Sequence, residues 1–327
     1  AATVKPAPAA PVAPTATAPA PSTGGMTASP PPPPPPVASP KITTVKDDAP
    51  VHDCDRLAAS PEDPQRKVTA VPRLDVRDAA ISSCREAVAR YPDTPRFMFQ
   101  LGRALLLRGS LEESTRWFKQ SAEGRYPIGM AYYGYAFSDG TGVTKDVVEA
   151  ARWLKRAAEA GNPMAMSSYA FLLTDAVGVQ RNDFEAREWY RKSALAGHRD
   201  GMSGLAFMLD NGRGGSKDLR GAAEWHRKAA EAGSTASMEA LAGMLHAGDG
   251  VTKNIPEAVN WIIRAIELGD KTTKENIANK STEWNDEFRR AFQRKLTDLG
   301  VYSGAIDGNF GSGTKAAIEK IFGRKKE

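Results

Sequence analysis

The chain has 327 residues, 41% of them hydrophobic, with two cysteines and a formal net charge of +5. This is enough apolar material for a buried core and enough length for two or three domains. The charge is modest for the length and gives no ground for a nucleic-acid partner. No apolar run is long enough to form a transmembrane segment.

Residues 1–50 are expected to form an extended tether. They consist mostly of Ala, Pro, Thr and Val, contain an unbroken proline run at 30–36 and lack aromatic residues. Such a composition cannot bury enough apolar surface to offset the entropy lost on folding. The chain opens without an initiator methionine, which suggests that a signal peptide or membrane segment was removed, or that the sequence is a fragment.

Residues 51–93 contain both cysteines, Cys54 and Cys84, and an amphipathic stretch from Arg77 to Tyr91. An even cysteine count in a chain that looks exported favours a disulfide. The bridge would close a loop of about thirty residues and stabilise the fold by roughly 3.5 kcal/mol. It would make this region a disulfide-linked cap on the repeats that follow. The alternative is a pair of buried free thiols in a cytosolic adaptor.

The centre of the chain repeats with a period of 36 residues. Five tryptophans mark the period, at Trp117, Trp153, Trp189, Trp225 and Trp261. The period defines four full units, at 128–163, 164–199, 200–235 and 236–271. Each unit reads as a helix A, a glycine-rich loop and a helix B, because small or apolar residues recur at helical spacing on both sides of the loop. Residues 94–127 form a preceding unit whose shorter loop has the spacing of a tetratricopeptide hairpin.

This pattern resembles the Sel-like branch of the tetratricopeptide superfamily. In the first full unit the resemblance is carried by a Gly-x-Gly-Val loop, an Ala-x-x-Trp and a closing Ala-Ala-x-x-Gly, formed by Gly140, Gly142, Val143, Ala150, Trp153, Ala157, Ala158 and Gly161. The resemblance implies an all-α, right-handed α-solenoid of helix-turn-helix repeats. It also implies a non-enzymatic scaffold that binds a protein or peptide partner.

Helix A residues are expected to line the concave wall of the solenoid. Tyr135, Phe171 and Phe207 follow one another at 36-residue spacing, and the series ends at Gly243. If they point into the groove, they form an aromatic ladder suited to an extended or helical peptide. If they point inward they are core residues, as recurring aromatic residues more often are. Lesser candidates for partner binding are Tyr132, Asp139, Asp175 and Asp210.

Residues 272–327 follow a different pattern, of helix, turn-rich loop and helix. Gly300 is expected to end the first helix, and Ser312 to cap the second. The stretch from Leu299 to Ile318 resembles the peptidoglycan-binding-domain-like motif, which implies affinity for cell-wall glycopeptide without hydrolysis. The implied binding residues are Tyr302, Asp307, Gly308, Phe310, Gly311 and Thr314. A second interpretation makes the same segment a C-terminal cap on the solenoid.

No catalytic constellation, cofactor site or metal site is predicted. The sequence lacks the phosphate-binding, nucleophile-elbow and His-Glu-x-x-His motifs. His226 takes a slot filled by Leu, Tyr or Ile in other units, which indicates packing, and His52 beside Cys54 has no second ligand cluster. The prediction is a periplasmic or envelope-associated bacterial scaffold. The competing hypothesis is the accessory part of a larger envelope hydrolase or caspase-like peptidase.

Overall fold

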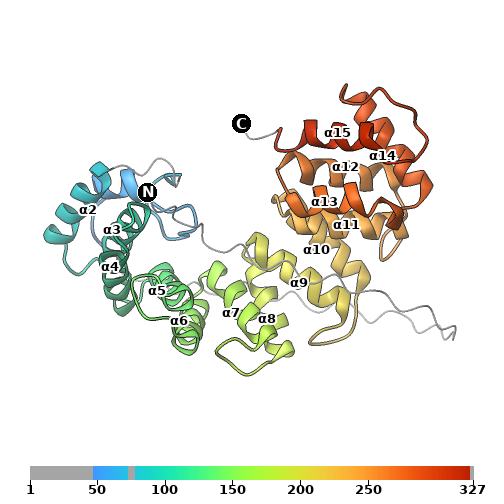
Figure 1. Cartoon of the computed structure of the whole chain (residues 1–327). Coiled ribbons are helices and arrows are strands. Elements are labelled where there is room, and N and C mark those ends of the chain that lie inside the picture. Colours follow the sequence, from blue (N-terminus) through green and yellow to red (C-terminus); the bar gives the residue numbers. More distant parts are fainter. Residues whose placement is uncertain (1–46, 73–77, 325–327) are drawn as a thin grey trace.

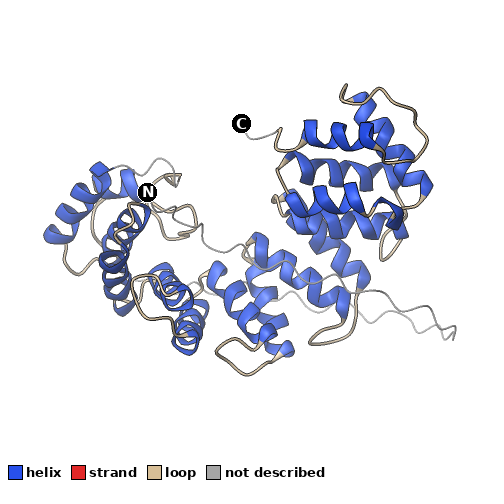
Figure 2. Cartoon of the chain, viewed as in Figure 1, coloured by secondary structure: helices blue, strands red, loops and turns tan. Residues whose placement is uncertain are grey.

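The computed structural model describes residues 47–72 and 78–324, which form helices and loops without a strand (Figure 2). The predicted all-α fold is therefore confirmed for this part of the chain. Residues 1–46 of the expected tether and the last three residues of the chain lie outside it. None of the described helices is long and apolar enough to span a membrane.

Two helices precede the repeats, α1 (Asp53–Ala58) and α2 (Asp78–Arg90). Five helical hairpins follow, and each of their ten helices has 13 residues. In chain order they are α3 (Pro95–Leu107), α4 (Leu111–Glu123), α5 (Pro127–Asp139), α6 (Val147–Glu159), α7 (Pro163–Asp175), α8 (Asp183–Leu195), α9 (Arg199–Asn211), α10 (Leu219–Glu231), α11 (Thr235–Ala247) and α12 (Ile255–Glu267). The chain continues with α13 (Lys271–Asn279), a 3₁₀ turn (Ser281–Glu283), α14 (Asp286–Asp298) and α15 (Ser312–Ile321).

Successive hairpins pack side by side into a curved solenoid. Each helix A contacts its own helix B and the helix B of the preceding hairpin. Figure 1 shows the stack as an arc, with α5, α7 and α9 on its inner side and α6 and α8 on its outer side. This arrangement confirms the predicted stack of helix-turn-helix repeats.

The loop and cap residues explain why the hairpins have uniform length. Helix A of the later hairpins ends on a residue in the left-handed region, for example Gly140 with φ of 75°. Ala176 adopts the same conformation with φ of 56°, although it carries a side chain. Helix B begins at a side chain that accepts a hydrogen bond from the backbone N–H groups of the first turn. These caps repeat every 36 residues, at Asp146, Asn182, Asp218 and Asn254.

The core lies between the helices of each hairpin and is built from leucines and methionines of helix A against alanines of helix B. The repeated tryptophans pack on the edge of this core and stay half-buried. In the later hairpins a cation three residues further along helix B lies over each indole ring, at 4.1 Å for Lys192 over Trp189 and 4.2 Å for Lys228 over Trp225. The tryptophans thus seal the outer edge of the core.

Candidate functional site

Helices α5, α7 and α9 lie on the inner side of the arc, and one row along helix A contains the aromatic residues predicted to line the groove (Figure 1). Residues at i, i+4, i+7 and i+11 share a face of a helix. We call the residues at these positions the inner stripe. Its members are Ile128, Tyr132, Tyr135 and Asp139 of α5, Met164, Ser168, Phe171 and Asp175 of α7, Asp200, Gly204, Phe207 and Asn211 of α9, and Ala236, Ala240, Gly243 and Ala247 of α11.

The three aromatic residues of the predicted ladder are half-buried. Tyr135, Phe171 and Phe207 each pack against the core and keep part of the side chain accessible. Neighbouring hairpins meet along the stripe, since the Tyr135 hydroxyl lies 2.6 Å from Oγ of Ser168. Tyr132 extends the row, with its ring centroid 6.1 Å from that of Tyr135.

Every charged residue of the inner stripe is acidic. Asp139 and Asp175 are exposed at the C-terminal ends of α5 and α7, and Asp200 lies in the first turn of α9. Burial is the largest cause of the raised pKa of Tyr135, and the negative charges of Asp200 and Asp139 raise it further. These two carboxylates therefore act on the same part of the stripe. The predicted Asp210 lies beside the stripe and is half-exposed.

Two cations near the stripe are already engaged. Arg199 forms an ion pair of 3.0 Å with Asp200. Arg213 pairs with Asp183 of α8 at 2.8 Å, and its guanidinium lies 5.8 Å from the Phe207 ring centroid. The pair with Arg213 contributes to a pKa of Asp183 well below its usual value, with hydrogen bonds from Arg181 as the largest cause.

The first hairpin, α3 and α4, presents a different stripe. Gly102 of α3 is equivalent to Gly134 of α5, because a Cβ at either position would crowd the matching residue of helix B, Phe118 at 2.7 Å or Leu154 at 3.0 Å. With this alignment, the positions of Ile128, Tyr132 and Tyr135 correspond to Arg96, Gln100 and Arg103. These three positions of the first stripe are polar and buried, and the fourth, equivalent to Asp139, is Leu107.

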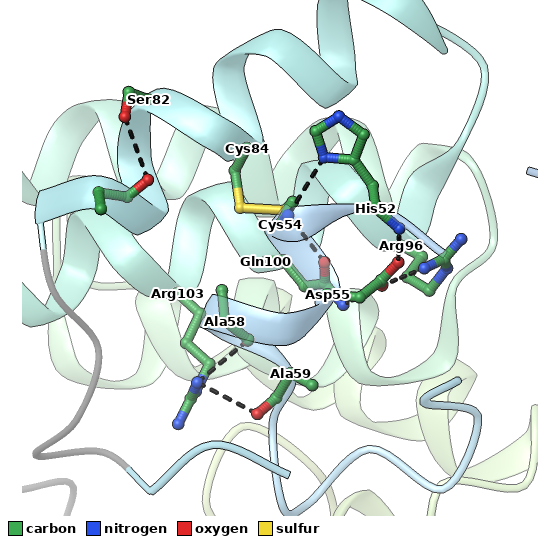
Figure 3. Close-up of a disulfide and its surroundings, with 11 residues drawn as sticks. His52, Cys54, Asp55, Ala58, Ala59, Ser82, Cys84, Arg96, Gln100 and Arg103 are labelled. Atoms are coloured by element: carbon green, nitrogen blue, oxygen red, sulfur yellow. Dashed lines mark hydrogen bonds and ion pairs between the residues drawn. A yellow bond between two sulfur atoms is a disulfide. The ribbon is translucent and has the colours of Figure 1, made fainter. Parts of the chain in front are cut away.

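An N-terminal cover, residues 47–72 including α1, buries this polar stripe. Arg96 donates from Nε to Oδ2 of Asp47 at 2.5 Å and forms an ion pair with Asp55 (Figure 3). Burial alone would lower the pKa of Arg96, but its hydrogen bonds and ion pairs with the two carboxylates raise it overall. Gln100 donates to Oδ1 of Asp55 at 2.9 Å. The cover thus supplies the carboxylates that neutralise the buried Arg96 and accept the hydrogen bond of Gln100.

Arg103 and Tyr126 hold the second half of the cover. Arg103 donates to the backbone carbonyls of Ala58 at 3.0 Å and Val71 at 2.9 Å. The Tyr126 hydroxyl, at the start of α5, donates to Oδ2 of Asp63 at 2.6 Å. Burial raises the pKa of Asp63, and the Tyr126 hydrogen bond acts in the opposite direction. A chain segment is therefore bound along the first helix A by carboxylate and carbonyl contacts.

The predicted disulfide between Cys54 and Cys84 is confirmed, and the free-thiol alternative is wrong. The bridge joins α1 of the cover to α2, and both cysteines are fully buried (Figure 3). It links the cover covalently to a residue of α2 that lies 30 positions later in the sequence. The cover cannot separate completely from α2 while the bridge is intact.

The residues of the C-terminal motif mainly organise the loop between α14 and α15. The Tyr302 hydroxyl donates to the carbonyl of Ala305 at 2.8 Å, and the Phe310 ring lies 5.3 Å from that of Phe292 in α14. Thr314 is buried in the first turn of α15. Gly308 has φ of 78°, in the region that favours glycine. These contacts leave the loop edge, including the exposed Ile306, as the accessible surface.

Gln293 of α14 is the centre of this loop, although no motif in the sequence singles it out. Its side-chain amide donates to the carbonyl of Asn309 at 2.9 Å and accepts from the backbone N–H of Gly308 at 2.7 Å. The backbone N–H of Asn309 also donates to Asp307, which is the largest cause of the pKa of Asp307 falling to about 2. The prediction that Ser312 caps α15 is wrong, because Gly311 is the N-cap and Ser312 begins the helix.

The C-terminal module is seated on the end of the solenoid. Trp284 stacks on Phe288 with ring centroids 4.0 Å apart and also contacts His246 of α11 at 5.0 Å. Lys274 of α13 pairs with Glu319 of α15 at 3.0 Å. The module therefore closes the last hairpin as well as carrying the wall-binding-like loop.

The described residues include no group of three or more His, Cys, Asp or Glu side chains that could hold a metal ion. His226 is buried in α10, with Nδ1 3.2 Å from Oγ of Ser237, and burial lowers its pKa to about 4. This confirms the prediction that His226 is a packing residue.

Comparisons with known proteins agree with these features. The Sel1 repeat matches residues 127–162, 163–198, 199–234 and 235–270, and a putative peptidoglycan binding domain matches residues 285–321. No curated protein sequence matches the chain.

Two solved structures resemble the fold. A Sel1 repeat protein from Oxalobacter formigenes has a TM-score of 0.56 and 22% identity, covering 67% of this chain and 96% of that one. A protective antigen of uropathogenic Escherichia coli with an SLR fold has a TM-score of 0.55 and 22% identity, covering 76% of this chain and 57% of that one.

Proposed function

Because the chain contains four Sel1 repeats and a putative peptidoglycan binding domain, we propose that it is a non-enzymatic scaffold of the bacterial envelope. The scaffold binds a protein partner along the inner stripe and associates with peptidoglycan through its C-terminal loop. The observation that carries the proposal is the row of half-buried aromatic residues at 36-residue spacing on three successive A helices, Tyr135, Phe171 and Phe207. Half-exposed aromatic rings offer a large apolar contact area at little cost in side-chain entropy.

Two features support a location in the envelope. Disulfides form and persist in oxidising compartments such as the periplasm, and the cover contains one. The match of residues 285–321 to a putative peptidoglycan binding domain gives a reason for the protein to stay near the wall.

The partner site is tested with a photo-crosslinking amino acid placed in cells that produce the protein. Ser168 lies on the inner stripe, and Arg152 is an exposed control on α6. We expect a crosslinked protein from position 168 that is lost when Phe171 and Phe207 are both replaced by serine, and none from position 152. Equal crosslinking from both positions, or from neither, would reject the inner stripe as the partner site.

The wall association is tested by co-sedimentation with purified sacculi. We expect the protein in the pellet, and less of it when Ile306, exposed on the loop between α14 and α15, becomes glutamate. Leu195→Glu is the control, since Leu195 has similar exposure and lies on α8. If the protein stayed in the supernatant, wall binding would be rejected, and the proposal of a partner site on the inner stripe would not be affected.

A further inference from the structure

The N-terminal cover shows what a stripe of this solenoid binds. The first stripe carries Arg96 and Arg103, and its occupant brings Asp47 and Asp55 against Arg96 and backbone carbonyls against Arg103. The occupant lies in the same molecule, so this is an observed case of a chain segment held on helix A by opposite charge. The equivalent positions on the later hairpins carry no cation: they hold aromatic, apolar or small side chains and Asp200, and the inner stripe adds Asp139 and Asp175 at the helix ends.

From this contrast we infer that the inner stripe binds an extended segment rich in lysine or arginine, with apolar side chains between the charges. The inference rests on the proposed partner-binding function and specifies the partner's chemistry. Asp139 and Asp175 supply negative charge, Asp200 is already paired with Arg199, and the aromatic row supplies apolar contact. The same charges disfavour a segment like the cover, because like charges brought together without partners repel.

The stripe also has room for a ligand side chain. The aromatic row stops at Gly243 of α11, where a Cβ would meet no atom within 4 Å. Gly204 is different, because a Cβ there would clash with the Tyr190 ring. Gly243 lies next in line after Phe207, and the surface beside it is open to a side chain of the bound segment. It is also a position where a substitution can change the charge of the stripe without disturbing the core.

The probe is a displayed library of random 12-residue peptides, selected against the full, oxidised protein and against the Phe171→Ser/Phe207→Ser variant. We expect the wild-type protein to enrich peptides with net positive charge and apolar residues, and the variant to lose them. Helix content measured by circular dichroism shows whether the variant remains folded.

The charge requirement is measured separately with Gly243→Arg, Gly243→Glu and the neutral Gly243→Gln. Fluorescein-labelled copies of the enriched peptides should bind Gly243→Arg about tenfold more weakly than Gly243→Glu, a difference of about 1.4 kcal/mol. This difference in affinity should become smaller when the salt concentration rises from about 0.05 M to about 0.5 M, because salt screens exposed charges.

The outcomes separate the inference from the function on which it rests. Enriched peptides that are neutral or acidic but still depend on Phe171 and Phe207 would overturn the inference and leave the partner site standing. Equal affinity of Gly243→Arg and Gly243→Glu would overturn it as well. If the same peptides were enriched by the Phe171→Ser/Phe207→Ser variant, or if no peptide were enriched, both the inference and the proposed partner site would be overturned.

Discussion

The first hairpin and the four that follow it use the same positions of helix A for different purposes. In the first hairpin these positions are buried and polar, and a segment of the same chain covers them. In α5, α7 and α9 they include half-buried aromatic residues, with carboxylates near the helix ends, and in α11 they are alanine and glycine. The helices are alike in length, but the first stripe has buried polar side chains and a preceding chain segment that covers them, and the later stripes have neither. One repeat scaffold therefore supplies both a sealed end and an open wall.

The contrast has a thermodynamic consequence, because a buried charge requires its partner whereas an exposed aromatic row does not. Arg96 and Asp55 are both fully buried, so either one alone would be an uncompensated charge. The residues of the open stripe already contact the core and lose little if no ligand is present. Stability should therefore respond strongly to changes under the cover and weakly to changes on the stripe.

The largest effect is expected for Arg96→Ala. The substitution leaves Asp55 buried without its cation, which should lower the free energy of unfolding of the N-terminal region by about 3–5 kcal/mol. Repeat arrays lose stability locally. Hydrogen exchange should therefore show easier opening of α1 to α4 and unchanged protection of α9 to α12.

The control for this prediction is Arg152→Ala. Arg152 pairs with Glu149 at 2.9 Å but is largely exposed, so its loss should cost about 0.5 kcal/mol or less. Equal effects of the two substitutions would show that the cover does not depend on its buried ion pairs.

The next effect in size is removal of the disulfide. The Cys54→Ala/Cys84→Ala variant frees a loop with a sequence separation of 30, which should destabilise the cover by about 3.5 kcal/mol. Urea unfolding would measure the loss of stability, and hydrogen exchange should show that the loss of protection is confined to α1, α2 and α3. A reducing agent should weaken the wild-type protein in the same region and leave the double-alanine variant unchanged. If protection were lost evenly from α1 to α12, the covered first hairpin and the later hairpins would not be independent in stability, contrary to this prediction.

The repeats were predictable from sequence because their signals are local and periodic. Tryptophans spaced by 36 residues, glycines in the loops and apolar residues at helical spacing each depend on a few neighbouring positions. The disulfide was predictable because the chain has two cysteines and so a single pairing. The caps at Asp146 and its equivalents followed the same period and could have been found from it.

The cover could not be predicted in the same way. Arg96 meets Asp47 and Asp55 across 49 and 41 residues, and no local pattern pairs them. One signal was present, since Arg96, Gln100 and Arg103 place polar groups on a single face of α3. The 36-residue period predicted the sequence positions of the aromatic residues of the inner stripe. It could not predict how exposed their rings are, because that depends on the packing of the neighbouring hairpins. The motif residues Asp307 and Gly308, predicted to bind a ligand, also shape the loop through their contacts with Gln293, which no local pattern indicates.

The smallest effect, and the one that examines the open stripe most directly, concerns its two glycines. Gly243→Ala should raise the free energy of unfolding by about 0.5–1 kcal/mol, because alanine is the better helix former and its Cβ meets no atom within 4 Å. Gly204→Ala gains the same helix propensity but forces the buried Tyr190 ring to move, which should leave a net loss of about 1–3 kcal/mol. Thermal unfolding of the two variants under identical conditions gives the comparison. Opposite signs would show that the inner surface is closely packed at α9 and open at α11, whereas a loss in both would mean that Gly243 lies against packed atoms and that the stripe offers no room for a ligand there.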